Sequence, residues 1–530
     1  MTRARLAPLA ILAALGLWLG ATYAITKRVG PPASVGLAGP ERFVAGARFL
    51  ADDSWLDARG GRRLEQTIFD AAFAAIDGAR HLVHVDMFLF NDFQGPEPER
   101  HRALSAELVA RLTAAARRPD GPTVTLVTDP INTLYGGRLS PELEALRAAG
   151  VHVTVTDLAP LQDSNPLWSS LWRWLVRPFG NAPGDTVPNP LGPGRATVRS
   201  WLALANFKAN HRKLLVVDAP RRDPDGGSAE EIGSVPGDAL VEGLAIVTSA
   251  NPHDGSAAHR NVALEVRGPV VADLLGAERA LLEASASPAA LGAFDAAAAR
   301  AGIEPTALSV LNDSGAERAR ADEPGEGAAG GGAPSVSLAN ESAIARAARG
   351  AIDAASPGDA VDLEMFYLAD LALVDALERA AGRGARVRAL LDVNSDAFGR
   401  AKNGVPNRPV AASLAAAGVE VRWCATAGEQ CHAKWLHVRA GDGADARHVA
   451  LVGSGNFTRR NLRDLNLETN LVYRAGPRDP VVGAMLARFD ALWANRPGRT
   501  YSLPYAAKAD ESAALAWQYR FMEITGLGTF

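Results

Sequence analysis

Short apolar runs alternate with longer stretches of helical periodicity along most of the chain. The runs at 85–92 ("VDMFLFND"), 124–129 ("VTLVTD") and 149–155 ("AGVHVTV") are separated by Ala- and Leu-rich segments with apolar positions at helical spacing. Strands of about four to eight residues between helices of about ten to fifteen are typical of a sheet covered by helices on both faces. The pattern predicts an α/β fold with a mostly parallel sheet.

The same order of elements occurs a second time. The runs at 363–370 ("LEMFYLAD"), 387–392 ("VRALLD") and 417–423 ("AGVEVRW") match the first three in order and pattern. An internal repeat of this size predicts two similar lobes, each a sheet covered by helices.

Changes in composition mark the boundaries of these lobes. We predict an N-terminal segment at 1–28, a first lobe at 29–312, a linker at 313–335, a second lobe at 336–500 and a C-terminal tail at 501–530. The linker is rich in Gly, Ala, Pro and Glu and has no periodicity, which is typical of a flexible connection. A second aperiodic segment, 219–238, interrupts the first lobe.

The N-terminal segment predicts a membrane location. An apolar stretch of about twenty residues, Leu6–Ile25, is flanked by basic residues on both sides, and this length suffices for a membrane-spanning helix. The small residues of "ATYA" at 21–24 offer a cleavage site, so a removed signal peptide is the alternative. We expect a membrane-associated protein with its lobes on the extracytoplasmic side, or an exported protein after cleavage.

A second segment has the composition of a membrane surface. Residues 165–180 ("NPLWSSLWRWLVRPFG") place three tryptophans beside Arg173 and Arg177, a combination that suits the interface of a bilayer. No matching segment occurs in the second half. A satellite core or a lid over a pocket is the alternative.

The composition weighs against some partners. The chain of 530 residues has a net charge of −4, so it has no overall basic field for collecting nucleic acid. Its two cysteines, Cys424 and Cys431, fit no zinc pattern and would form a short-loop disulfide in an oxidising compartment. We expect no metal and no cofactor.

One short motif carries the chemistry. The run "NHRKLLVVD" at 210–218 places His211 and Lys213 on the same face of an apolar strand, because residues i and i+2 project together. The pair returns as His432 and Lys434 in "CHAKWLHVR". Six of the 55 basic residues are lysines, and two of these six follow a histidine at matching repeat positions. Such positions favour a compact ammonium charge over a guanidinium.

Each pair is followed by a strand that ends in small and amide residues. These are Ser249 and Asn251 in "VTSAN" and Ser454 and Asn456 in "VGSGN", which we predict to bind the substrate phosphate. One histidine can attack phosphorus while the other protonates the leaving oxygen. The lysines and amides would hold the non-bridging oxygens, so the chemistry requires no metal.

This doubled constellation resembles the phospholipase D superfamily, whose signature is His-x-Lys-x4-Asp followed by a Gly-Ser-x-Asn strand, present twice in one chain. His211, Lys213 and Asp218 match the first motif in full, but Thr248 stands where the family usually has Gly, and Arg439 where the second motif has Asp. The resemblance covers about residues 35 to 500. It implies two α/β lobes related by a pseudo-twofold axis, one histidine from each in a single site, and a phosphohistidine intermediate.

The family also carries an acid about a dozen residues after the Asn, which orients the histidine. Glu468 lies 12 residues after Asn456 and fits this place. The equal spacing in the first half leads to Ala263, which leaves Glu265 as the substitute orienting acid.

These acids bear on the roles of the two histidines. A carboxylate favours the imidazolium form of a nearby histidine, so with Glu468 beside it His432 is expected to be the acid and His211 the nucleophile. The other eight histidines, His259 among them, lack the repeated context and are expected to be surface or core residues.

The first hypothesis is a membrane-bound enzyme that transfers or hydrolyses phosphatidyl groups, similar to bacterial cardiolipin synthases and phospholipases D. Its partners would be phospholipid, the membrane surface, and water or an alcohol as acceptor. A phosphodiesterase of the same superfamily acting on nucleic acid is the alternative, since Arg459 and Arg460 lie beside the second motif. A third is a non-catalytic membrane scaffold, which Arg439 in place of Asp would allow. The head group, the acceptor and the oligomeric state stay open.

Overall fold

The computed structural model describes residues 32–94, 101–218, 243–310, 333–397 and 400–526, together with Gly528 and a few residues between 13 and 24. Most of the predicted N-terminal segment and of the predicted linker lie outside these residues, as does the aperiodic segment of the first lobe. No helix within the described ranges is long and apolar enough to cross a membrane.

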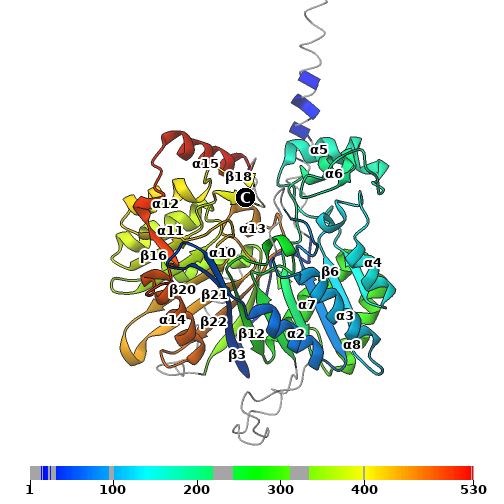
Figure 1. The fold of residues 1–530 in the computed structure, drawn as a ribbon, viewed down its shortest axis with the longest axis horizontal. Helices are drawn as coiled ribbons and strands as arrows, with labels where there is room; N and C mark the ends of the chain where they lie inside the picture. Colours follow the sequence, from blue (N-terminus) through cyan, green and yellow to red (C-terminus); the bar gives the residue numbers. More distant parts are fainter. Residues whose placement is uncertain are drawn as a thin grey trace, which may run out of the picture.

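The first lobe is built on an eight-stranded sheet (Figure 1). In spatial order its strands are β4 (Arg62–Glu65), β3 (Gly46–Leu56), β12 (Asn261–Arg267), β11 (Leu244–Thr248), β10 (Lys213–Val217), β5 (Leu82–Met87), β6 (Thr123–Thr128) and β7 (His152–Val155). The motif that contains His211 and Lys213 therefore leads into a central strand.

The second lobe repeats this arrangement. Its strands β14 (Ser335–Asn340), β22 (Thr469–Ala475), β21 (Arg447–Gly453), β20 (Lys434–Ala440), β15 (Ala360–Met365), β16 (Arg386–Leu391) and β19 (Glu420–Cys424) follow the same order as β3, β12, β11, β10, β5, β6 and β7. The predicted α/β fold of two similar lobes is confirmed.

The direction of the strands differs from the prediction, because the sheets are mixed rather than mostly parallel. In the first sheet only β5–β6 and β6–β7 run parallel, and in the second only β15–β16 and β16–β19. The other neighbours, such as β10–β11 and β20–β21, are antiparallel. Antiparallel neighbours need no crossover helix, so helical stretches separate only some of the apolar runs.

The motif strands are buried on both faces. In β10, Leu214 and Val216 belong to a core that both lobes share, whereas Leu215 and Val217 pack in a core of the first lobe alone. This alternation is the period of two that a strand imposes on its side chains. It explains why the run after Lys213 is apolar at every position.

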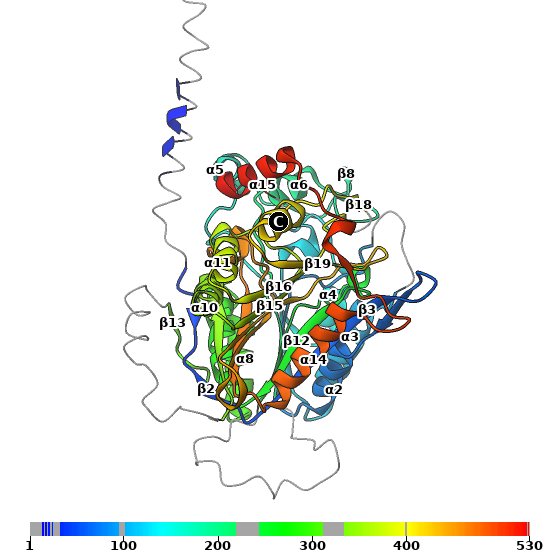
Figure 2. The ribbon, with the colours of Figure 1, turned by 90° about the vertical axis from the view of Figure 1, so that its left-hand side faces the viewer.

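Helices cover these cores (Figure 2). In the first lobe, α2 (Ile68–Gly78), α3 (Leu104–Arg117) and α4 (Pro141–Ala148) pack on its own core, and α7 (Val270–Ala284) and α8 (Pro288–Arg300) on the shared core. In the second lobe, α10 (Ser342–Asp353), α11 (Leu371–Gly382) and α12 (Asn407–Ala416) pack on its own core, and α14 (Pro480–Ala494) on the shared core.

Two additions lie at one end of the molecule, at the top of both Figure 1 and Figure 2. Between β7 and β10 the chain forms α5 (Pro166–Leu175), the 3-10 turn η2 (Arg177–Phe179) and α6 (Val198–Leu204). The residues of the predicted tail form β23 (Ser502–Pro504), which pairs with β19, and α15 (Ala513–Thr525). They are thus part of the second lobe's fold.

Strand pairing also crosses the predicted boundary between the lobes. The short strands β1 (Leu37–Ala38) and β2 (Arg42–Phe43) pair with β14, and β13 (Ser309–Val310) pairs with β1. Residues from both ends of the predicted first lobe therefore complete the second sheet.

Candidate active site between the lobes

His211 and His432 line one cavity of about 1210 Å³, although they belong to different lobes. Each lies two residues before the first residue of its strand, β10 or β20. The backbone N–H of His211 donates to the carbonyl of Leu467 (2.9 Å), and that of His432 donates to the carbonyl of Arg260 (2.8 Å). Each histidine segment is therefore held by the opposite lobe.

Glu468 lies against His211, not against His432 as the sequence predicted. Its Oε1 is 2.7 Å from His211 Nδ1, and it also accepts hydrogen bonds from Ser454 Oγ and Asn461 Nδ2. The prediction was wrong because a spacing counted along one lobe does not show which histidine the acid will face. Burial raises the pKa of the Glu468 carboxyl to about 8, against the opposing effect of Lys213.

Asn261 takes the equivalent place at His432. Its Oδ1 is 3.1 Å from His432 Nδ1 and accepts a hydrogen bond from Ser249 Oγ at 3.0 Å. Glu265, the predicted substitute acid, does not reach the site, because it forms an ion pair with the half-exposed Arg48 at 2.7 Å. The partner of His432 is thus an amide ten residues after Asn251, which a search for an acid could not find.

Both motif lysines are buried beneath aromatic rings. Lys213 Nζ donates to the carbonyl of His211 (2.8 Å) and lies 5.1 Å from the ring centre of Phe88. Lys434 Nζ donates to the carbonyl of His432 (2.6 Å) and lies 5.2 Å from that of Phe366. Burial lowers the pKa of Lys213 to about 7 and lowers that of Lys434 well below its ordinary value.

The predicted phosphate-binding residues divide into two groups. Asn251 and Asn456 line the cavity. Ser249 and Ser454 are fully buried, and their hydroxyls hold Asn261 and Glu468. The geometry therefore gives the serines a positioning role in place of the predicted contact with phosphate.

Asp218 lies at the far end of β10 from His211. Its carboxylate accepts backbone N–H groups of Arg80 (3.0 Å), His81 (2.8 Å) and Leu82 (3.0 Å) at the start of β5. It joins two strands and does not touch the cavity. At the equivalent place in the second lobe, Arg439 donates to the carbonyl of Gly358 (3.0 Å), so a different contact secures the same strand end.

Several residues of the cavity wall were not predicted. The aromatic rings of Phe88, Phe366 and Tyr367 line it, with the cation of Lys402. Arg460, which the sequence placed beside the second motif, lines it as well. His259 also lines it, although its context predicted a surface or core residue, and its ring centre is 5.9 Å from that of His432. The sequence held one signal that could have found it. His259 lies two residues before Asn261, and Asn466 lies two residues before Glu468 in the second lobe and also lines the cavity.

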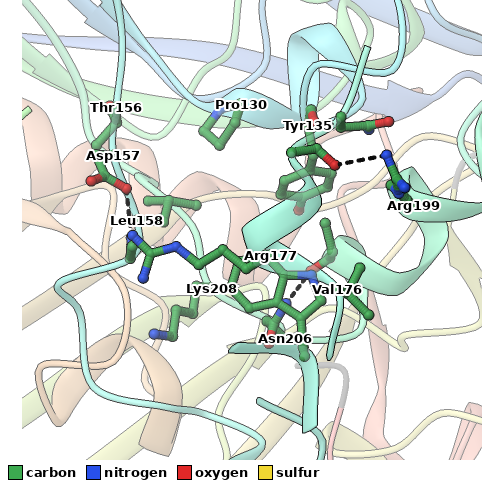
Figure 3. A pocket seen from close by; sticks show the side chains of 15 residues that line it. Pro130, Tyr135, Thr156, Asp157, Leu158, Val176, Arg177, Arg199, Asn206 and Lys208 are labelled. Atoms are coloured by element: carbon green, nitrogen blue, oxygen red, sulfur yellow. Dashed lines mark hydrogen bonds between the residues drawn. The ribbon is translucent and has the colours of Figure 1, made fainter. Parts of the chain in front are cut away.

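A second cavity, of about 260 Å³, is lined in part by the insertion between β7 and β10 that contains α5, η2 and α6 (Figure 3). Tyr135 and Lys208 line both cavities, and Trp172 and Arg177 of the Trp-rich segment line the smaller one. Lys208 Nζ is 2.6 Å from Asp163 Oδ1, and burial lowers its pKa to about 8. Part of the Trp-rich segment therefore encloses a pocket, in line with one of the alternatives drawn from the sequence.

The electrostatics favour a neutral imidazole at His211. Burial lowers its pKa well below the ordinary value, and the charges of Lys213 and Lys434 lower it further. When the Glu468 carboxylate accepts the Nδ1 proton, the lone pair of Nε2 is free. A neutral imidazole in this tautomer is the form a nucleophile requires.

Residues 349–493 match the family model described as "Cardiolipin synthase, PLD-like domain". The match covers most of the second lobe, and the first lobe repeats its strand order and its His-x-Lys pair. The second lobe is therefore similar to the PLD-like domains of the phospholipase D superfamily. No curated protein matches the chain.

Three solved structures give weak likenesses. A phosphatidylserine synthase from Haemophilus influenzae Rd KW20 is 9% identical, with 92% of this chain and 94% of that chain covered and a TM-score of 0.49. A phospholipase D family member, Nuc, from Salmonella typhimurium is 19% identical, with 32% and 97% covered and a TM-score of 0.24. A polyphosphate kinase from Porphyromonas gingivalis is 13% identical, with 91% and 54% covered and a TM-score of 0.42, so the chain spans about half its length.

Proposed function

We propose that the protein is a phosphodiesterase or phosphatidyltransferase that acts on phospholipids through a phosphohistidine on His211. The observation that carries this proposal is the pair of histidines at one cavity, each held at Nδ1 by a residue of the opposite lobe. This leaves both Nε2 atoms for chemistry on a phosphate between them.

The reaction would run in two steps. First, His211 Nε2 attacks phosphorus, the bond from phosphorus to the leaving oxygen breaks, and His432 gives its proton to that oxygen. Then water or an alcohol returns a proton to His432 and attacks phosphorus, and the bond to His211 breaks. Burial and Lys434 lower the pKa of His432 in the free protein, and a bound phosphodiester anion would oppose that shift because it favours the imidazolium.

The walls of the cavity support a lipid substrate. They are rich in apolar side chains, which include Phe88, Leu89, Ile131, Leu191, Trp201, Leu204, Phe207 and Phe366. Arg460 also lines the cavity, but its guanidinium stacks on Phe207 at 5.0 Å and donates to the carbonyl of Gly528. Acyl chains fit such walls better than a polyanion does.

The disulfide between Cys424 and Cys431 supports a site outside the cytoplasm. We propose that the lobes work at the extracytoplasmic surface of the membrane, with residues 1–28 as the anchor. A chain exported after signal cleavage is the alternative.

Mass spectrometry of purified protein with mixed phospholipids, with and without glycerol as acceptor, tests the substrate. We expect phosphatidic acid with water alone and a phosphatidyl-glycerol product when glycerol is added. Cleavage of single-stranded DNA with no change in the lipids would favour the nucleic-acid alternative instead.

The intermediate is tested with a nitrophenyl phosphodiester, whose leaving group needs little protonation. The His432→Ala variant should accumulate a phosphoryl adduct on His211, seen by intact mass after an alkaline quench, and His211→Ala should form none. An adduct on His432 in the His211→Ala variant would reverse the assignment. Absence of an adduct in both variants would favour a non-catalytic scaffold.

A further inference from the structure

The helices α5, α6 and α15 lie at one end of the molecule (Figures 1 and 2), and they carry exposed apolar side chains from both lobes. Trp174 is 66% exposed and Trp517 is 68% exposed. We call this set the apolar end surface: Leu167, Trp174, Leu175, Phe179, Val198, Trp201, Trp517, Phe521 and Ile524. Large apolar side chains exposed together at one end of a molecule are typical of interaction sites.

The helices that carry this surface turn their apolar faces outward. On α15, Trp517, Phe521 and Ile524 recur at intervals of four and three residues and so share one face. The other face is anchored by the buried Tyr519, whose hydroxyl donates to the carbonyl of Ala369 at 2.7 Å. On α5 the buried residues are serines, while Trp174 and Leu175 are exposed. A surface helix in water normally buries its apolar side chains and exposes its polar ones, so the pattern of α5 is reversed.

Cations accompany the apolar residues. Arg177, Arg199 and Arg520 are exposed on the same three elements or beside them, although the chain as a whole carries a net charge of −4. Aromatic and arginine side chains together suit the headgroup region of a bilayer, where arginine pairs with anionic lipid.

The apolar end surface is continuous with the wall of the catalytic cavity. Trp201 is 43% exposed at the surface and also lines that cavity, together with Leu204 from the next turn of α6. A lipid that leaves a bilayer at this end would therefore meet apolar side chains along a path toward His211 and His432.

We infer that the apolar end surface docks on an anionic phospholipid bilayer, and that the helix α15 and the insertion α5–α6 enter its interface together. This inference rests on the proposed function, because it names the surface from which that site takes its lipid.

Cysteine labelling of the full chain tests this contact. Both natural cysteines are joined in a disulfide, so one introduced cysteine gives a single reactive thiol. An environment-sensitive dye would be placed on Trp174→Cys, on Trp517→Cys and, as the matched control, on Phe43→Cys. Phe43 is an exposed apolar residue of β2, which lies at the opposite end in Figure 2.

The labelled proteins are mixed with vesicles of phosphatidylglycerol and phosphatidylcholine that contain nitroxide-labelled lipid. We expect the emission of the dyes at 174 and 517 to fall by about twofold or more, and that at 43 to stay unchanged. A tether at the N-terminus alone would not bury either dye. Equal quenching at all three sites would overturn the inference. A change in the emission of the dyes at 174 and 517 that depends on protein concentration without lipid would also overturn it, since a second copy of the chain would then cover the surface.

The dye reports its environment and does not require turnover. Protein that docks but fails to cleave any phosphodiester would contradict the proposed function and leave the docking surface intact. Protein that cleaves a soluble diester but leaves both dyes in water would contradict the docking surface alone.

A different observation concerns His259. Its Nδ1 accepts a hydrogen bond from the backbone N–H of Gln430 at 3.2 Å, so the ring proton lies on Nε2. That Nε2 is buried and has no partner among the described residues, while the ring lines the cavity beside His432. A buried donor without a partner is costly, and a ligand in the cavity would satisfy it.

The geometry points to His259 as the donor that stabilises the leaving oxygen next to His432, within the proposed reaction. His259→Ala should then lower kcat on a diester with a poor leaving group by about tenfold or more, and on a nitrophenyl diester by less than about threefold. His259→Gln, which keeps an N–H donor, should recover part of the loss. Equal losses on both diesters would overturn the role, and His152→Ala, a histidine away from the cavity, is the control.

Discussion

Glu468 and Asn261 occupy equivalent places at the two histidines but differ by one charge. Glu468 can accept the Nδ1 proton of His211 as an anion, whereas Asn261 offers His432 a neutral carbonyl. An anion stabilises the positive charge that His211 gains when it is phosphorylated. A neutral amide leaves His432 free to exchange its proton. The asymmetry therefore supports His211 as the nucleophile, for a reason opposite to the one that the sequence suggested.

This arrangement predicts a pH dependence. Below about 8 the buried Glu468 carboxyl holds a proton and donates it to His211 Nδ1, which places the ring proton on Nε2. As the pH rises through about 8, Glu468 becomes the acceptor and Nε2 becomes nucleophilic. With a nitrophenyl diester, kcat/KM should therefore rise as the pH increases toward about 7, above which loss of the Lys213 ammonium charge opposes a further rise.

Glu468→Gln should lower kcat/KM by at least about 100-fold and remove the rise with pH, because the amide cannot become an anion. The same substitution at Glu265 is the control, since that side chain pairs with Arg48 outside the cavity. A flat profile in the unmodified protein would contradict the prediction. So would an equal loss of activity in Glu265→Gln.

The confined positions of Lys213 and Lys434 predict that arginine cannot replace either lysine without loss of activity. Each ammonium is fully buried between a histidine carbonyl and a phenylalanine ring, and a guanidinium is wider and planar. Lys213→Arg should reduce turnover of the nitrophenyl diester by about 100-fold or more. Near-normal turnover with the thermal unfolding temperature unchanged would show that a compact charge is not required.

At the scale of elements, Arg212 joins the start of β10 to two acidic residues. Its fully buried guanidinium is 3.1 Å from Glu278 of α7 and 3.1 Å from Glu341, which precedes α10 in the other lobe. Removing one partner of a buried ionic network leaves the other charges uncompensated.

Arg212→Leu should therefore lower the free energy of unfolding by about 3–5 kcal/mol, measured by urea unfolding. Arg48→Leu removes a half-exposed partner of a surface pair and should cost less than about 1 kcal/mol. Adding Glu341→Gln to Arg212→Leu should restore part of the loss. Equal effects of the two arginine variants would contradict the importance of the network.

Much of the fold at this scale follows from local pattern. The repeated strands, the histidine and lysine pairs and the insertion at 165–180 leave a signal within a few residues of the sequence. The helix α15 left one too, in the spacing of Trp517, Phe521 and Ile524, although we predicted only a tail. Contacts between lobes leave no such signal. Glu468 meets a histidine 257 positions away, and no spacing within either lobe encodes that choice.

At the scale of the whole molecule, each lobe completes the other's half of the site. His211 N–H donates to Leu467, and Leu467 N–H donates to Ala209, so the two segments are bonded reciprocally. Arg260 and Gln430 form the matching contact at His432, where Arg260 N–H donates to the Gln430 carbonyl (2.9 Å). The lobes also share one apolar core. Association therefore rests on buried contacts between the lobes, and the predicted linker is not required to maintain it.

A protease site placed within the predicted linker, 313–335, should consequently be cleavable without loss of function. The two fragments should elute together in gel filtration, and turnover of the nitrophenyl diester should stay within about twofold of the uncut protein, because the contacts that position the two histidines lie outside this segment. Fragments separated in denaturant and refolded singly should be inactive, since His211 then lacks Glu468 and His432 lacks Asn261, and mixing them should restore activity. Activity in either single fragment would contradict a site shared between the lobes.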